Sequence, residues 1–595
     1  MNAPSKKASG SKSTSNRRRW VPEWTQRYQL DTFQDDLLAG MTTAIMLIPQ
    51  SMAYAMLAGI PPIMGLYAST VPIFIYAILG SSRQLAIGPV AMASLLVATG
   101  LNEIYGIKEA STIEHIQMVL LLTFTVGVVQ VLMGLFRLGG LVNLLSHPVV
   151  SGFTAAAAII IGTSQLQHLV GFSIPKGPFY EMILYALVHI LDVNPSTFGV
   201  SVIGIGIIVG LKKLNPRLPA ALIAVTFGIS VAYLFNLEKQ GVALLGTIPS
   251  GLPQIESLDF IDIQTMERIL PISIVIALIA FMESISAAKI YARQNRYNIS
   301  PIRELVGQGV ANMGSSLFGG YVVGGALSRT AVNASAGART PIAGIITGIV
   351  ICLTLAFLTA PFAFLPKPIL AAIIMVAVVG LIDIKEIFHL WAMKKDDLAL
   401  LCLTFFATIF LSIELGILIG VMASLLWLVW CSTRPHIAIL GKIPKTTSYR
   451  SVAHFPQAID FKQILILRMD AQFFFGNVVY LKETLATEIG KRPDLVAVVL
   501  DASSMNTLDS TAADTFEEII NSLRRQHIEV MVSHIKGPVL EVMQVAGIVE
   551  ILGEGHIHYE VHDAVQAAIR LRDALRSGLT DEQAEEKLGK SDILD

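Results

Sequence analysis

Gly324-Gly325-Ala326-Leu327-Ser328-Arg329-Thr330-Ala331-Val332-Asn333-Ala334-Ser335-Ala336-Gly337 lies within a long series of apolar segments, yet it consists of glycines, hydroxyls, an amide and one arginine. An arginine at bilayer depth costs about 2.5–3.5 kcal/mol on insertion scales, so it is normally retained for a task. The glycines permit unwound backbone, and the small residues after them can form a short, closely packed helix. The stretch predicts a half-helix that starts inside the membrane, with Arg329 at its N-terminus, as a place to hold an anion.

The composition indicates a membrane protein. The chain has 595 residues, of which 53% are hydrophobic and 15% charged, and its mean hydropathy is +0.63. A soluble protein has about 25% charged residues. The formal net charge of −1 gives no sign of nucleic-acid binding. Cys352, Cys402 and Cys431 lie in apolar runs without disulfide or metal-ligand spacing, so we expect no metal and no cofactor.

The N-terminal residues 1–30 are rich in serine, lysine and arginine, and no acid precedes Glu23. The first apolar run begins near Leu37, too far along the chain for a secretory signal, so we expect no cleaved signal peptide. We interpret residues 1–30 as a disordered basic tail at the cytoplasmic face of the inner (cell) membrane. Nucleic-acid binding by this tail is the weaker alternative.

Apolar stretches of spanning or near-spanning length recur through residues 31–433, which we expect to form a polytopic α-helical transport domain. Two of the fourteen stretches are short, because ten to fourteen helical residues extend only about 15–21 Å against a hydrocarbon core of about 30 Å. The fourteen predicted spans are 37–55, 64–80, 88–101, 116–136, 148–170, 197–212, 218–235, 269–289, 303–319, 329–338, 341–361, 366–381, 397–413 and 414–431.

The connections between these spans alternate in basic content. Those after even-numbered spans contain Arg83, Arg137, the pair Lys212 and Lys213, Arg339, and the pair Lys394 and Lys395, whereas those after odd-numbered spans are poorer in such residues. Because cytoplasmic loops are enriched in lysine and arginine, the alternation predicts that both termini are cytoplasmic.

Matching irregularities suggest that the domain contains two repeats. The short third and tenth spans begin near Gly88-Pro89 and Arg329, seven spans apart, and polar residues enter the first and eighth spans at Gln50 and Glu283. An odd number of spans per repeat inverts the second copy. Paired, glycine- or proline-interrupted short segments at corresponding positions indicate a transporter binding site. The sequence therefore predicts that the two short spans meet head to head around an anion.

Two other groups could join this site. Gln50 and Tyr54 share a helix face, so they could donate hydrogen bonds to the anion, or they could simply join neighbouring spans. Glu283 is the acid well inside the eighth span. Burial disfavours a charged carboxylate, which suits a proton-coupling residue. A static ion pair with Arg329 is the alternative.

The composition changes after Trp430. We expect a basic linker at 434–450, a soluble α/β domain at 451–575 and a charged tail at 576–595. Apolar runs of strand length occur at 464–467, 495–500 and 528–532. Asp509 or Ser510 could cap a following helix, and a phosphorylatable hydroxyl is the weaker alternative. We find no catalytic triad or nucleotide loop and expect no enzyme.

Several motifs resemble one known family. Ile48-Pro49-Gln50-Ser51-Met52-Ala53-Tyr54-Ala55, followed by residues 57–69, resembles the signature of the sulfate permease (SulP) family, relatives of animal solute carrier family 26. Residues 147–154 and 327–333 are similar to other stretches of that family. The C-terminal part resembles its STAS domain, which is named for sulfate transporters and anti-sigma factor antagonists. The resemblance extends from about Asp31 to Leu571.

The resemblance implies seven plus seven inverted spans, arranged as core and gate domains like those of uracil permease. It also implies a homodimer with elevator-like alternating access. By position, the anion site would be lined by Gln50, Tyr54, Ala91, Leu327, Ser328 and Arg329, and Glu283 would be the proton-coupling acid.

We therefore expect a secondary active anion transporter, embedded in membrane lipid, that takes up sulfate together with protons. The alternatives are sodium-coupled bicarbonate or dicarboxylate transport, anion exchange, and an uncoupled anion channel. A sensor that signals through the STAS domain is a further alternative.

Overall fold

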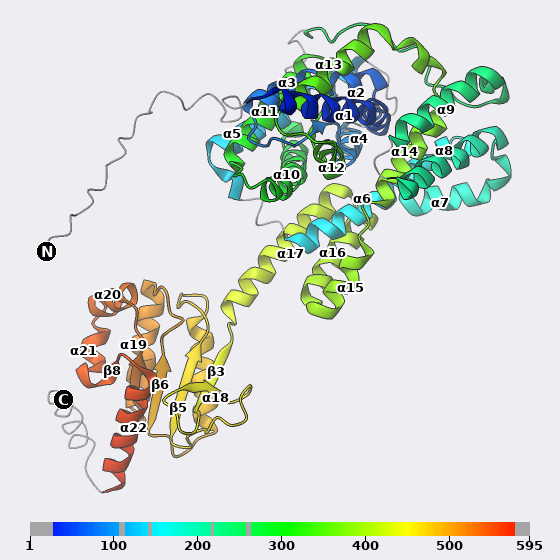
Figure 1. The fold of residues 1–595 in the computed structure, drawn as a ribbon. Coiled ribbons are helices and arrows are strands. Elements are labelled where there is room, and N and C mark those ends of the chain that lie inside the picture. Colours follow the sequence, from blue (N-terminus) through cyan, green and yellow to red (C-terminus); the bar gives the residue numbers. More distant parts are fainter. Residues whose placement is uncertain are drawn as a thin grey trace, which may run out of the picture. The chain divides into compact units, whose positions relative to one another are not determined.

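A computed structural model describes residues 28–105, 113–140, 146–175, 177–215, 219–256 and 263–577. The predicted basic tail at 1–30 and charged tail at 576–595 therefore lie almost entirely outside the described residues. The chain divides into two compact units, Met1–Ser424 and Leu425–Asp595, and each is considered on its own (Figure 1).

The first unit is helical, and every predicted span coincides with a helix or, for the second span, with a pair of helices. The helices are α1 (Leu30–Leu57), α2 (Pro62–Tyr67), α3 (Val71–Leu79), α4 (Ala91–Tyr105), α5 (Ile113–Leu135), α6 (His147–Val170), α7 (Phe179–Val188), α8 (Pro195–Leu214), α9 (Ala220–Phe235), α10 (Ile263–Gln294), α11 (Pro301–Leu317), α12 (Leu327–Ser335), α13 (Ile342–Phe357), α14 (Lys367–Val379), α15 (Ile384–Met393), α16 (Lys395–Phe410) and α17 (Ile413–Thr433), the last of which continues into the second unit.

The membrane character of the chain is clear from these helices. By length and composition, eight helical stretches among the described residues could each cross a membrane. The other apolar helices are shorter, and the count of fourteen spans stays a prediction. Local signals set several starts: proline is at the first or second position of α6, α8 and α11, and the Asn194 side chain accepts a hydrogen bond from the Thr197 N–H (2.9 Å).

The packing of the helices has the symmetry expected of inverted repeats. If α1 corresponds to α10, α3 to α11 and α5 to α13, then the contact of α1 with α13 corresponds to that of α10 with α5, and the contact of α3 with α13 corresponds to that of α11 with α5. In the same way, α6 packs on α16 as α14 packs on α8. Figure 1 shows one group of helices, α1–α5 and α10–α13, beside a second group, α6–α9 and α14–α17.

The two short helices are joined by a minimal sheet. Strand β1 (Ile87–Gly88) pairs antiparallel with β2 (Gly324–Gly325), so that Gly88 lies opposite Gly324. Both strands are buried, and each leads directly into a short helix, α4 or α12. The pairing places the starts of these helices, which are far apart in the sequence, next to each other.

Side chains from neighbouring helices satisfy the unwound backbone before β2. The Asn312 side chain accepts from the Val323 N–H (2.8 Å) and donates to the Val323 carbonyl (3.2 Å). The Ser315 hydroxyl donates to the Tyr321 carbonyl (2.7 Å). Non-helical backbone at membrane depth is tolerated where such partners replace water. The polar residues of α11 therefore stabilise the break.

The second unit contains a six-stranded sheet in the order β4-β3-β5-β6-β7-β8, with β5 to β8 parallel and β3 and β4 antiparallel at one edge. The strands are β3 (Ile437–Lys442), β4 (Tyr449–Ser451), β5 (Ile464–Met469), β6 (Ala497–Asp501), β7 (Glu529–Ser533) and β8 (Ile557–His558). The helices are α18 (Val478–Gly490), α19 (Ser510–Arg524), α20 (Gly537–Val545), α21 (Ile548–Leu552) and α22 (Val561–Arg576).

The expected linker at 434–450 is wrong, because this segment supplies β3 and the first two residues of β4. The apolar run Ile437–Leu440 is short and lies among basic residues, so composition alone favoured a linker. Pairing with β5, which follows more than twenty residues later, makes it a strand. The N-cap interpretation of Asp509 agrees with the structure, since its carboxylate accepts from the Ala512 N–H (2.8 Å).

Candidate functional site

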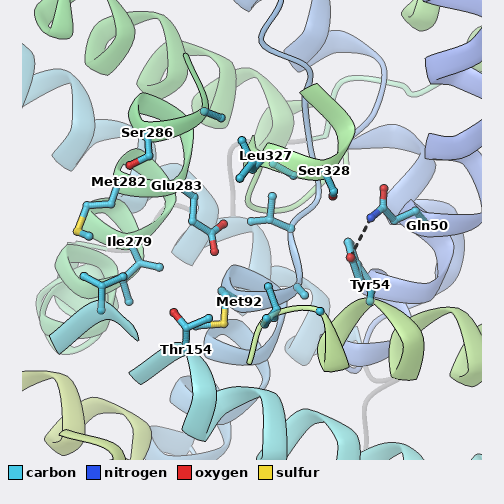
Figure 2. A pocket seen from close by; sticks show the side chains of 18 of the residues that line it. Gln50, Tyr54, Met92, Thr154, Ile279, Met282, Glu283, Ser286, Leu327 and Ser328 are labelled. Atoms are coloured by element: carbon cyan, nitrogen blue, oxygen red, sulfur yellow. Dashed lines mark hydrogen bonds between the residues drawn. The ribbon is translucent and has the colours of Figure 1, made fainter. Parts of the chain in front are cut away.

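A cavity of about 910 Å³ lies within the first unit and is lined by residues of both helix groups. Six of the predicted site residues line it: Gln50, Tyr54, Ala91, Glu283, Leu327 and Ser328. Arg329, Gly88 and Pro89 do not. The structure thus brings most of the predicted residues around one space, as Figure 2 shows for the side chains.

The Gln50 and Tyr54 side chains form one hydrogen-bonded unit on α1. Both residues are 5% exposed, and the Gln50 Nε2 atom donates to the Tyr54 hydroxyl over 2.9 Å. The Gln50 Oε1 atom is buried and has no hydrogen-bond partner among the described residues. Because Tyr54 accepts this bond, its own O–H remains able to donate. The pair therefore offers polar atoms to a ligand in the cavity.

Two helix N-termini reach the same cavity. Val90, Ala91 and Met92 line it from the start of α4, and Ala326, Leu327 and Ser328 line it from the start of α12. The first helical hydrogen bonds are donated by Ser94 to Val90 and by Thr330 to Ala326. The N–H groups before them have no partner within their helices. Such termini attract anions through these donors and through the helix dipole.

Arg329 lies behind the cavity wall rather than on it. Its side chain is fully buried and donates to the backbone carbonyls of Ala86 (3.0 Å), Pro89 (3.1 Å) and Gly324 (3.0 Å). The sequence predicted that this guanidinium lines the anion site. The structure instead shows it joining the backbone of the first repeat to that of the second.

Gly88 and Pro89 lie beside the Arg329 side chain and do not line the cavity. Gly88 has a φ of 156°, which residues with side chains rarely adopt, and a Cβ atom there would lie 3.4 Å from the Arg329 Cζ atom. Pro89 contributes its carbonyl oxygen. Because 3.4 Å is an ordinary contact distance, it is the φ of Gly88, together with the nearer Leu47 Cδ1 atom at 3.2 Å, that favours glycine at this position.

Glu283 of α10 extends its carboxylate into the cavity, between Leu327 and Thr154 in the view of Figure 2. It is the one acid among the described residues that line the cavity. The side-chain hydrogen bonds found for Arg329 go to backbone carbonyls, and the ion pairs between described residues do not include Glu283. The placement therefore does not support the alternative of a static Glu283–Arg329 pair.

The sequence did not predict several other polar residues that line the cavity. Thr154 of α6 and Ser286 of α10 add hydroxyl groups to the cavity, and His147, Lys212 and Lys289 add basic groups. The sequence gives only a weak indication for the two lysines, because Lys212 and Lys289 lie at the ends of predicted spans. The hydroxyl residues look like ordinary members of apolar helices, and only the cavity shows that Thr154, from the second helix group, and Ser286, from the same helix as Glu283, line one space with this acid.

Inverted repeats, broken helices and paired N-termini at one cavity are typical of membrane transporters that bind their substrate between two helix breaks. The chain belongs to the sulfate permease family, whose model matches residues 33–404, and a STAS domain model matches residues 456–564. This family consists of membrane transporters, so the expectation that the chain is not an enzyme is confirmed.

Relatives in plants cover nearly the whole chain. Sulfate transporter 4.1, chloroplastic, of Arabidopsis thaliana is 38% identical over an alignment of 575 residues that covers 93% of this chain and 82% of the relative. High affinity sulfate transporter 2 of Stylosanthes hamata is 33% identical, covering 92% of this chain and 85% of the relative.

Solved structures support the fold. The murine Solute Carrier 26 family member A9 anion transporter in the inward-facing state superposes with a TM-score of 0.84 at 21% identity, covering 94% of this chain and 96% of that chain. The transmembrane domain of a cyanobacterium bicarbonate transporter, BicA, gives a TM-score of 0.57 at 22% identity, covering 67% of this chain and 98% of that chain.

Proposed function

We propose that this protein is a secondary active transporter that carries sulfate into the cell together with protons. The observation that carries the proposal is a single cavity shared by two helix N-termini and one acid, Glu283. The names of the plant relatives support sulfate as the anion.

Sulfate would bind at the starts of α4 and α12. At neutral pH its oxygens accept hydrogen bonds, which the backbone N–H groups near Ala91 and Ser328 and the Tyr54 hydroxyl can donate. Arg329 adds positive charge from behind the wall while it holds the two backbones together. The site would therefore recognise charge and oxygen geometry without a direct arginine contact.

Glu283 would couple sulfate to a proton through charge. A carboxylate and a dianion in one cavity repel each other, and the repulsion is strong where water is scarce. Protonation of Glu283 removes one negative charge, so the protonated carrier would bind sulfate more tightly. Release of the proton at the cytoplasmic side would then favour release of the anion.

The two helix groups suggest how access could alternate. We propose that α1–α5 with α10–α13 form a mobile core, that α6–α9 with α14–α17 form a gate, and that the core moves like an elevator. On the basis of the alternating basic loops, we also propose that both termini are cytoplasmic. The resemblance to the sulfate permease family is the basis for proposing a homodimer in the cell membrane.

Uptake of labelled sulfate into proteoliposomes tests the proposal. An acidic exterior should stimulate uptake by the unaltered protein. Glu283→Gln, which mimics the protonated acid, should bind sulfate but show no response to the pH gradient. Glu267→Gln, on the exposed start of the same helix, is the matched control and should behave like the unaltered protein.

Other outcomes would contradict the proposal in distinct ways. Stimulation by a sodium gradient alone, with preference for bicarbonate or a dicarboxylate, would replace it with sodium-coupled transport. Strict dependence on an anion in the opposite compartment would indicate exchange. A current far larger than carrier turnover would indicate a channel.

A further inference from the structure

Helix α15 has an outward face of large apolar side chains. Ile384, Phe388 and Trp391 follow the spacing of one helix face and are 60%, 71% and 66% exposed. Leu390, on the other side of the helix, is 6% exposed. Its neighbour on that side, Glu386, contacts His147 at the start of α6, with 3.3 Å between Oε1 and Nδ1. The inner side of α15 is therefore fixed against the first unit while the apolar side faces outward.

This helix is too short to cross a membrane. Its ten residues extend about 15 Å, half of a hydrocarbon core of about 30 Å. Asp383 separates it from α14, because the Asp383 carboxylate accepts from the N–H groups of Lys385 and Glu386 and so begins a new helix. Asp383 thus divides the apolar stretch Lys367–Met393, which as a whole is long enough to cross a membrane, into two separate helices.

The position of α15 in the chain, between two apolar helices, favours the membrane surface. Four residues connect it to α14, and α16 begins directly after Lys394. Both neighbours are among the apolar helices of the transport unit, so the two ends of α15 are held where these helices meet the surface.

The side chains around the apolar face suit a phospholipid boundary. Lys385 and Lys395 are exposed, and their long side chains can reach lipid phosphates. Lys394 lies 3.7 Å from Asp397 and is partly neutralised. Tryptophan prefers the boundary between headgroups and acyl chains. In the first repeat the corresponding helix is α7, which also has exposed apolar residues, among them Leu184 and Leu187, but contains no lysine or arginine.

We propose that α15 is an interfacial helix that inserts Ile384, Phe388 and Trp391 between the headgroups and acyl chains of the bilayer. Through Glu386 and His147 it would hold the start of α6, at one end of the cavity, at a fixed depth in the membrane. The occupant of this face is phospholipid, and neither a second copy of the chain nor another protein covers it.

Fluorescence quenching by brominated phospholipids tests the inference in the full-length protein and requires no transport. The variant keeps Trp391 and replaces the other four tryptophans by phenylalanine. Lipids brominated near the headgroup should quench Trp391 about twofold more than lipids brominated at the chain end, because interfacial helices lie about 5–10 Å deep. The order should reverse for a control variant that also carries Trp391→Phe and has Leu403→Trp, an exposed position in the middle of α16.

Two results would overturn the inference. If neither lipid quenches Trp391, protein covers the face. If chain-end bromines quench it more strongly, α15 lies within the hydrocarbon core. In the same background, Phe388→Glu should lower the quenching of Trp391 by the headgroup-side lipid, since a charge opposes insertion, and unchanged quenching would contradict the proposed contact.

Discussion

The two breaks in the transport unit have matching backbones and different side chains. In the first repeat, β1 and the start of α4 supply carbonyls and a cavity wall of Val90, Ala91 and Met92. In the second repeat, β2 and α12 supply the same geometry together with Arg329. The first and eighth spans differ in the same way, with a neutral pair at Gln50 and Tyr54 and an acid at Glu283.

The comparison shows that the two repeats share the backbone arrangement of the breaks and differ in the charged side chains that they place there. Inverted repeats bring two helix N-termini together without any charged side chain. The second repeat then adds one arginine, Arg329, which hydrogen-bonds to the backbone of both breaks, and one acid, Glu283, which lines the cavity. A symmetric pair of charges would place two acids or two arginines in one buried space, where like charges repel strongly.

The largest expected effect on stability comes from removing the Arg329 side chain, which joins the two breaks. Arg329→Ala deletes three hydrogen bonds from a charged donor, each worth about 1.5–3 kcal/mol, and leaves buried carbonyls unpaired. We expect a loss of several kcal/mol, seen as a large drop in the thermal unfolding temperature of the purified protein. Arg303→Ala, which removes one exposed bond to the Gly80 carbonyl (3.1 Å), is the control and should change stability little.

One result would break the comparison. If Arg329→Ala unfolds at the same temperature as the unaltered protein and loses sulfate binding, the arginine binds sulfate and does not stabilise the two breaks.

A smaller difference in stability is expected between alanine variants of the two glycines that lie opposite each other in the sheet. Gly88→Ala forces a side chain onto a residue with a φ of 156° beside the Arg329 guanidinium, at a cost of about 1–3 kcal/mol. Gly324→Ala has no such φ, and its Cβ would meet its nearest neighbours at an ordinary 3.4 Å. Unfolding temperatures should fall for Gly88→Ala and change less for Gly324→Ala. Equal decreases in unfolding temperature would show that both positions require glycine to the same extent.

The smallest effect concerns the neutral pair of the first repeat. Tyr54→Phe removes the acceptor of the Gln50 amide and also the hydroxyl that we propose donates to sulfate. A hydrogen bond is worth about 0.5–1.5 kcal/mol, so loss of the bond to sulfate should raise its KM about two- to tenfold. Tyr321→Phe removes a similar buried bond to the Ser94 hydroxyl (3.0 Å). Neither Tyr321 nor Ser94 lines the cavity, so this variant should leave the KM unchanged. An unchanged KM for Tyr54→Phe would remove the pair from the site.

Much of this architecture was predictable because it depends on local patterns. Apolar length gave the helices, and Gly88-Pro89 and Gly324-Gly325 marked the two breaks. The spacing of Gln50 and Tyr54 placed them on one helix face, where the structure shows their hydrogen bond. The strands at 464–467 and 528–532 were visible as apolar runs, whereas β3 was missed because its partner β5 lies far along the chain.

The sequence by itself determined that the chain crosses a membrane, that it contains two related breaks, and that polar residues gather there. These properties follow from hydropathy and from the backbone freedom of glycine, which are local. Only the tertiary structure decided the roles within the site. A guanidinium can bind an anion or a set of carbonyls, and the carbonyls of Ala86, Pro89 and Gly324 surround Arg329 once β1 pairs with β2. The fold therefore places the Arg329 guanidinium among backbone carbonyls, whereas the starts of α4 and α12 and the Glu283 side chain line the cavity.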